Sequence, residues 1–197
     1  MLRSVTKEFW LKSLHVGDIG ICLGTSIFSK FQNISRNLGR EGDKPASHGF
    51  FVKISPWISE ADGRRVTGHN KISRYFSDHH KIWIFRYPNL TQEQIDDMNL
   101  VVSTAEKVNG QYSWGGIKEF WKPWFGIPMK ERAGVFCTEF TSAIIRAANL
   151  PYMDKKDFEI SPSRQREWFQ DYAVPRKIVN LALYYENGKF YTEEEII

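Results

Sequence analysis

Cysteine is scarce in this sequence: Cys22 and Cys137 are the only two among 197 residues. Two cysteines cannot build a disulfide framework, and no Cys-x-x-Cys pair offers metal-ligand spacing. Uninterrupted apolar runs of about 18 residues, as a membrane-spanning helix needs, are also missing. The first residues lack the apolar run of a secretory signal. Together these absences predict a protein of a reducing compartment, and we expect a cytoplasmic location.

Clustered charge is lacking as well. The formal net charge is +4 and the isoelectric point is near 9.0, which suits attraction to nucleic acid, anionic lipid or an anionic cell-wall polymer. The basic residues are nevertheless scattered, without the dense, aromatic-interleaved Lys/Arg runs of a nucleic-acid surface. We therefore predict a solvated surface and no specific nucleic-acid partner.

Apolar and aromatic residues are plentiful. They make up 42% and 15% of the chain, which is typical of a folded protein of this length. We predict one domain over residues 1–197, with a core at 16–170 and a C-terminal hairpin and tail at 178–197.

The middle of the chain is rich in strand patterns. Residues 19–23 are predicted to form a buried strand that makes Cys22 a core residue. A second strand is predicted over residues 47–54, with His48 at its start. Glu60 lies on a third predicted strand, 57–61, which follows a tight turn at Pro56. A short strand at 64–67 and a strand at 81–87 complete an antiparallel sheet, in which Glu60 is expected close to His48.

Helical patterns flank these strands. Phe9, Trp10 and Leu14 predict a short lead-in helix over residues 5–14, and an apolar stripe predicts another over 25–38. Thr91 to Gln94 has the form of a capping box that opens a helix reaching Val108. Further helices are expected from Cys137 to Asn149 and from Ser161 through Phe169, with a hairpin at 178–191 around Asn187-Gly188. The predicted fold class is α+β, an antiparallel sheet packed against helices.

Cys137 is the candidate catalytic nucleophile of this sequence. It precedes Phe140, Ile144 and Ala147 at helical spacing, so it lies at a helix start, where the helix dipole favours thiolate over thiol. A thiolate nucleophile needs a base and a group that orients the base. His48 and Glu60 supply these types, and Glu139 or a backbone carbonyl are the substitutes for Glu60.

Five short motifs, in order, carry a resemblance to a known family: Gly17-Asp18-Ile19, Ser47-His48-Gly49-Phe50, Ile58-Ser59-Glu60-Ala61, Gly110-Gln111-Tyr112-Ser113-Trp114 and Phe136-Cys137-Thr138-Glu139-Phe140. This succession resembles the circularly permuted NlpC-type papain-fold hydrolases, most closely the YiiX-like branch. In that family the histidine precedes the cysteine along the chain. The resemblance covers roughly residues 16–170 and leaves out the C-terminal hairpin.

The resemblance implies roles for individual residues. Cys137 matches the nucleophile, His48 the base and Glu60 the residue that orients the base, while Glu139 matches a motif position of open role. Gly49 directly after His48 departs from the common His-x-Gly order, and Thr138 stands where serine is frequent. We place Tyr112, Trp114, Glu139 and Asp18 as candidate substrate-binding residues, with packing for Tyr112 and a turn for Asp18 as alternatives.

The aromatic segment from Trp114 to Phe125 has two interpretations. It is expected to form an irregular loop that covers the core, or, with nearby lysines, to contact a membrane or line a wall for an acyl chain or sugar. His69, Asp78, His79 and His80 do not share the spacing of a metal site. We predict no metal and no cofactor.

The expected function is that of a cysteine hydrolase, a thiol peptidase that cleaves an amide bond through an acyl-enzyme. The resemblance implies a bacterial or phage protein acting on cell-wall peptides (peptidoglycan). Two alternatives stay open: a lipid acyltransferase or thioesterase of the same fold, implied by the related lecithin retinol acyltransferase branch, and a non-catalytic binding or virion-structural module.

Overall fold

The computed structural model describes residues 2–24, 46–61, 66–107, 137–155 and 160–193. The strands are β1 (Leu2–Val5), β2 (Ile19–Leu23), β3 (His48–Ile54), β4 (Trp57–Ala61), β5 (Val66–Lys71), β6 (Lys81–Arg86), β7 (Asn180–Glu186) and β8 (Lys189–Glu193). The helices are α1 (Lys7–Lys12), α3 (Gln92–Lys107), α5 (Cys137–Ala147) and α6 (Pro162–Glu167), with a 3-10 helix η1 (Ile72–Tyr75) and a π-helix η4 (Trp168–Ala173).

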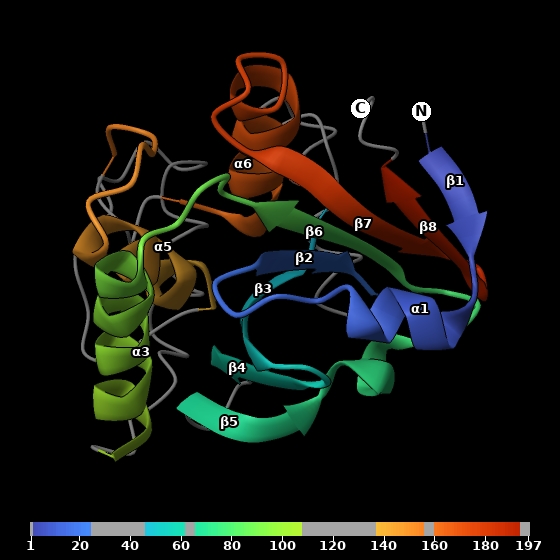
Figure 1. The fold of residues 1–197 in the computed structure, drawn as a ribbon, viewed down its shortest axis with the longest axis horizontal. Helices are drawn as coiled ribbons and strands as arrows, with labels where there is room; N and C mark the ends of the chain where they lie inside the picture. The colour runs from blue at the N-terminus through green and yellow to red at the C-terminus, as the bar shows by residue number, and fades with distance from the viewer. Residues whose placement is uncertain (1, 25–45, 62–65, 108–136, 156–159, 194–197) are drawn as a thin grey trace, which may run out of the picture.

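The described strands form one eight-stranded sheet in the order β1-β8-β7-β6-β2-β3-β4-β5. All neighbouring strands are antiparallel. Because β1 pairs with β8, the first and last described strands lie together at one edge of the sheet (Figure 1). The prediction of an α+β fold with an antiparallel sheet and helices is confirmed at this level.

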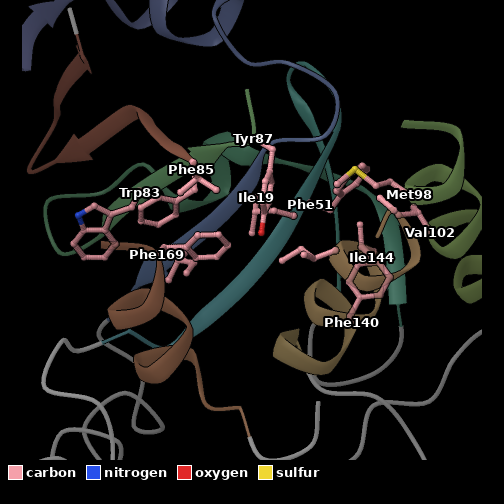
Figure 2. Packing of buried hydrophobic residues seen from close by; sticks show 14 of the residues in the cluster. Ile19, Phe51, Trp83, Phe85, Tyr87, Met98, Val102, Phe140, Ile144 and Phe169 are labelled. Carbon is pink, nitrogen blue, oxygen red and sulfur yellow. The ribbon is translucent and has the colours of Figure 1, made fainter. Parts of the chain in front are cut away.

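One face of the sheet packs against α3, α5 and η4. Ile19, Phe51 and Phe85 from the strands are fully buried there, and Figure 2 shows side chains from the three helices meeting them: Met98, Val102, Phe140, Ile144 and Phe169. The Phe85 and Phe169 rings stack with their centroids 4.6 Å apart. This face therefore holds the larger core and fixes α5 against the sheet.

The other face carries a second apolar cluster. It gathers Phe50, Val52 and Ile58 from β3 and β4, Ile72 from η1, and Trp10 from α1. Trp10 is fully buried, and its indole Nε1 donates to the Tyr184 carbonyl oxygen at 3.1 Å. The N-terminal helix thus covers this face of the sheet.

Two predicted helix boundaries are confirmed in atomic detail. The Thr91 hydroxyl accepts from Gln94 N at 3.2 Å, and Gln94 Oε1 accepts from Thr91 N at 3.0 Å, so the capping box starts α3. At the end of α5, Asn149 adopts φ 50°. Leu150 N and Asn149 N donate to the Ile145 and Arg146 carbonyls, which is a Schellman stop.

The C-terminal hairpin belongs to the main sheet. Asn187 and Gly188 both have positive φ, 49° and 76°, as a two-residue turn between right-twisted strands requires. The hairpin places β7 beside β6 and β8 beside β1. The part of the chain that the family resemblance leaves out therefore extends the sheet at its β6 side.

Several expectations differ from the structure or lie outside it. The strand predicted at 64–67 is observed as β5 at Val66–Lys71, and strand β1 before the lead-in helix was not predicted. The helix predicted at 25–38 and the aromatic segment Trp114 to Phe125 lie outside the described residues. Among the described helices, none has the length and apolar character to cross a membrane.

Candidate active site

His48 is the first residue of β3 and lies directly opposite Cys22 of β2. Its side chain is 15% exposed. The next residue, Gly49, is directed toward α5: a Cβ there would lie 3.4 Å from Thr141 Oγ1 and 3.1 Å from Gln165 Oε1. A glycine at this point of β3 lets α5 approach the strand closely, one helical turn beyond Cys137.

Glu60 lies on the neighbouring strand β4, and its side chain is fully buried. Its Oε2 atom is 2.7 Å from His48 Nε2. Because an ionised carboxylate only accepts hydrogen bonds, Nε2 carries the proton and donates it to Glu60. The proximity of Glu60 to His48 that the strand order predicted is confirmed.

Three further side chains donate to the Glu60 carboxylate. Asn70 Nδ2 and Arg74 NH1 each donate to Oε1 at 2.7 Å, and the Tyr75 hydroxyl donates to Oε2. Both carboxylate oxygens therefore have two donors, as a buried charge requires. The carboxylate holds the His48 ring in one orientation and one tautomer.

Cys137 begins the described part of α5 and is 4% exposed. It lies close enough to His48 that its negative charge and hydrogen bonding contribute to raising the pKa of the imidazole. Since Nε2 of His48 is committed to Glu60, Nδ1 is the nitrogen that remains for the cysteine. The structure therefore brings Cys137, His48 and Glu60 together, with His48 hydrogen-bonded to Glu60 and influenced by the charge of Cys137.

The charges of these groups shift their protonation. Burial lowers the pKa of His48, but the negative charge and hydrogen bond of Cys137, followed by those of Glu60, outweigh it and raise the pKa from 6.5 to about 10. Burial raises the pKa of Glu60, yet His48, Tyr75 and Arg74 together lower it from 4.5 to about 2. At neutral pH the site thus holds a protonated imidazole beside an ionised carboxylate.

Cys22 is a second thiol close to this site. It is 1% exposed and lies in the apolar cluster beneath β3. Burial, followed by the charges of Glu60 and Cys137, raises its pKa well above the ordinary value. Cys22 is therefore an inert core thiol at neutral pH, as the sequence predicted.

Asp18 is separated from these residues. It precedes β2, at the opposite end of that strand from Cys22 and His48. Its carboxylate is 1% exposed and accepts from His15 N and, in bidentate fashion, from Arg86 Nε and NH2 at 2.8 Å. The structure does not bring Asp18 to Cys137, and the alternative, a turn residue, describes what it does.

The other three candidate substrate-binding residues are Glu139, Tyr112 and Trp114. Glu139 is half-buried in the first turn of α5. It is two residues from Cys137, and side chains at that helical spacing do not face each other. Tyr112 and Trp114 lie outside the described residues. Substrate binding by these three residues stays a prediction.

The donors to Glu60 are the part of the site that the sequence did not indicate. Asn70, Arg74 and Tyr75 follow one another closely at the end of β5 and in η1. The signal that points to them is indirect: a carboxylate in a buried strand needs donors, and the next strand along the chain is the first place to look. Within the described ranges, no group of three or more His, Cys, Asp or Glu side chains is arranged to hold a metal ion.

No protein-family model and no curated protein matches this chain. The functional proposal therefore depends on the geometry of Cys137, His48 and Glu60 and on the motif resemblance.

Proposed function

We propose that this protein is a cysteine hydrolase that cleaves an amide bond in a peptide. Cys137 is the nucleophile, His48 the general acid and base, and Glu60 the residue that orients His48. The observation that carries the proposal is the convergence of three groups: His48 Nε2 lies 2.7 Å from Glu60 Oε2, and Cys137, at the start of α5, is near enough to raise the pKa of His48.

The first half of the reaction forms an acyl-enzyme. The Cys137 thiolate attacks the amide carbonyl carbon, a carbon–sulfur bond forms, and the π electrons of the carbonyl move to its oxygen. When the carbonyl re-forms, the carbon–nitrogen bond breaks, and the leaving amine takes the proton of the His48 imidazolium. The products are a free amine, a thioester on Cys137 and a neutral His48.

The second half restores the enzyme. Neutral His48 takes a proton from a water molecule as that water attacks the thioester carbonyl carbon. The carbon–sulfur bond then breaks, which releases a carboxylic acid and returns Cys137 to the thiolate and His48 to the imidazolium. Because the negative charge of Cys137 is a main cause of the raised pKa of His48, acylation lowers that pKa and makes His48 a base at the stage that needs one.

For the fold we propose a permuted papain-like arrangement. Two features support it: a cysteine helix, α5, that contacts β3 and β4, and a histidine that precedes the cysteine in the chain. The family resemblance implies cell-wall peptide as the substrate, and we take that as the first substrate to test. Lipid esters are the second, because the resemblance also extends to acyltransferases.

The test is incubation of the wild-type protein with cell-wall peptide fragments and, separately, with acyl lipids, followed by mass spectrometry of the products. We expect cleavage of an amide bond in the peptide fragments by wild type, and none by Cys137→Ala. Cys22→Ala is the matched control, since it removes the other thiol, and it is expected to retain cleavage. Release of fatty acid with intact peptides would favour the lipid enzyme.

The result that contradicts both enzymatic proposals is equally definite. If wild type and Cys137→Ala leave every amide and ester intact, while Cys137→Ala keeps the protein's biological activity, the chain is a non-catalytic module with this geometry.

A further inference from the structure

Four described side chains donate to Glu60, namely His48, Asn70, Arg74 and Tyr75. Among them Arg74 carries a permanent charge, whereas His48 is charged only when it is protonated. The NH1 atom of Arg74 lies 2.7 Å from Glu60 Oε1, while His48 Nε2 lies 2.7 Å from Oε2 of the same carboxylate. The Arg74 side chain is 43% exposed and that of Glu60 fully buried. A cation that reaches the surface is thus joined, through one buried anion, to the histidine.

The catalytic cycle makes two opposite demands on His48. It has to be protonated beside the Cys137 thiolate, and it has to lose that proton once the thiolate has become a thioester. A buried carboxylate without a second counter-charge would keep the imidazolium protonated at both stages, because opposite charges at this distance strongly favour the charged form. Arg74 supplies that counter-charge.

We propose that Arg74 is a positioning residue of this site: its guanidinium holds the Glu60 carboxylate and offsets its charge, so that His48 releases its proton after Cys137 has been acylated. The inference rests on the proposed function for its meaning in catalysis. The effect of Arg74 on the titration midpoint of His48 can nevertheless be measured without any substrate.

The groups that face His48 come from four elements. Cys137 faces it from α5, Glu60 from β4, Tyr75 from η1 and Cys22 from β2. Burial raises the pKa of both Tyr75 and Cys22, and the pKa of Glu60 is lowered to about 2. In a Cys137→Ala protein, His48 is therefore the group of this set that titrates between about pH 5 and 9.

The test is a titration of the His48 imidazole by nitrogen-15 NMR in the Cys137→Ala protein, where the missing thiolate stands in for the acylated state. The His48 signals, among five histidines, are identified by their loss in His48→Gln. Adding Arg74→Gln is expected to raise the titration midpoint of His48 by about one pH unit. Lys71→Gln is the matched control, because it removes the same charge from a side chain that lies over the Trp57 ring, and it is expected to leave the midpoint within about 0.2 pH units, as for a screened surface charge.

Arg74→Lys separates charge from shape. This variant keeps the positive charge, so we expect its midpoint to match that of the Lys71→Gln control. A midpoint in Arg74→Gln no higher than in the control, or an equal rise in Arg74→Lys, would overturn the proposal. Absence of amide cleavage by the wild-type protein, with the predicted NMR shifts present, would overturn the proposed function alone.

Discussion

The Glu60 side chain shows how this protein keeps a charge in its interior. The side chain is fully buried, and both of its oxygens accept hydrogen bonds, from His48, Asn70, Arg74 and Tyr75. Two of these donors are cations at neutral pH. Such a carboxylate is stabilising only while it stays ionised, because protonation removes one of its acceptor positions and weakens its attraction to the two cations.

This arrangement predicts an acid-dependent loss of stability. The pKa of Glu60 is about 2 in the folded protein and 4.5 ordinarily. A folded-state pKa below the unfolded one means that the stabilisation is present above about pH 4.5 and is lost as the pH falls toward 2. At about 1.4 kcal/mol per pH unit, the loss is about 3 kcal/mol.

Urea unfolding at several pH values between 6 and 2 measures this effect. The free energy of unfolding of the wild type is expected to fall more steeply with acid than that of Glu60→Gln, which has no carboxylate to protonate. Glu8→Gln serves as the control, since Glu8 forms an exposed pair with Lys12 and should follow the wild-type curve. Parallel curves for wild type and Glu60→Gln would show that the carboxylate is not held in this way.

At the scale of elements, the site depends on how closely α5 approaches β3. Gly49 is the point of approach: a Cβ there would lie 3.1 Å from Gln165 Oε1 of α6, which is tight, and 3.4 Å from Thr141 Oγ1 of α5. These two residues are themselves buried and joined, with Gln165 Nε2 donating to Thr141 Oγ1 at 2.8 Å. Moving either side chain alone would break a buried hydrogen bond, so the pair resists displacement from β3.

Gly49→Ala tests this spacing. The added methyl group is expected to displace Gln165 of α6 by a few tenths of an ångström and, through its hydrogen bond, to disturb Thr141 of α5. We expect this to lower the free energy of unfolding by about 1–3 kcal/mol, as overpacking does. It should also slow the alkylation of Cys137 by iodoacetamide, because the thiol moves relative to His48.

The control for this experiment is Gly20→Ala. Its added methyl group would collide with the Phe50 ring, so it should destabilise the protein without separating α5 from β3. If Gly20→Ala and Gly49→Ala slow the alkylation equally, the effect comes from general destabilisation, and the close approach at Gly49 has no special role.

The capping box of α3 gives a second prediction at this scale. Thr91→Ala removes the hydroxyl that accepts from Gln94 N and is expected to lower the free energy of unfolding by about 1 kcal/mol. Thr104→Ala, the same substitution at an exposed position within α3, should instead be neutral or slightly stabilising. Urea unfolding of both variants measures the difference, and equal effects would contradict the assignment of the cap.

Local patterns explain which parts of the fold could be predicted from the sequence. The cap at Thr91, the stop at Asn149 and the turn at Asn187-Gly188 are signals carried by a few adjacent residues, and the structure confirms all three. Strand β1 has no such signal. Its place is set by pairing with β8, nearly the whole chain length away, which no local pattern contains.

The same distinction applies to the site. His48 and Glu60 lie on successive strands joined by a tight turn, so their proximity follows from strand order. The donors Asn70, Arg74 and Tyr75 reach Glu60 through a shift in register between β4 and β5 and through the 3-10 helix that follows. Register shifts and short helices depend on tertiary packing, which is why these partners were not predicted.

At the scale of the whole molecule, β1 and the β7–β8 hairpin complete one side of the sheet, and α1 packs against one of its faces. The β7–β8 hairpin pairs with β6, β1 pairs with β8, and α1 contacts β8 (Figure 1). Trp10 is the central residue of this region, since its ring is fully buried and contacts Phe76 and Phe190 edge to face. The N-terminal segment thus joins the C-terminal hairpin to the second apolar cluster, which contains Trp10 and Phe50.

Trp10→Ala measures the strength of that connection. Loss of a fully buried indole is expected to lower the free energy of unfolding by about 3–5 kcal/mol. Phe9→Ala, at the neighbouring position, which is 52% exposed, is the control and should change it by less than about 0.5 kcal/mol. A small effect of Trp10→Ala would mean that the N-terminal helix is not an integral part of the fold.

The central claim is that His48, held by Glu60, activates Cys137, and it is tested most directly by the rate at which iodoacetamide alkylates Cys137 at pH 7, followed by mass spectrometry. We expect the wild-type thiol to react about 10-fold or more faster than a free cysteine, whose thiolate is a minor form at that pH, and the rate to fall at least 10-fold in His48→Ala. Cys22, whose pKa is raised well above the ordinary value by burial, should stay unlabelled in both proteins. A wild-type rate no faster than that of a free thiol, unchanged in His48→Ala, would contradict the claim.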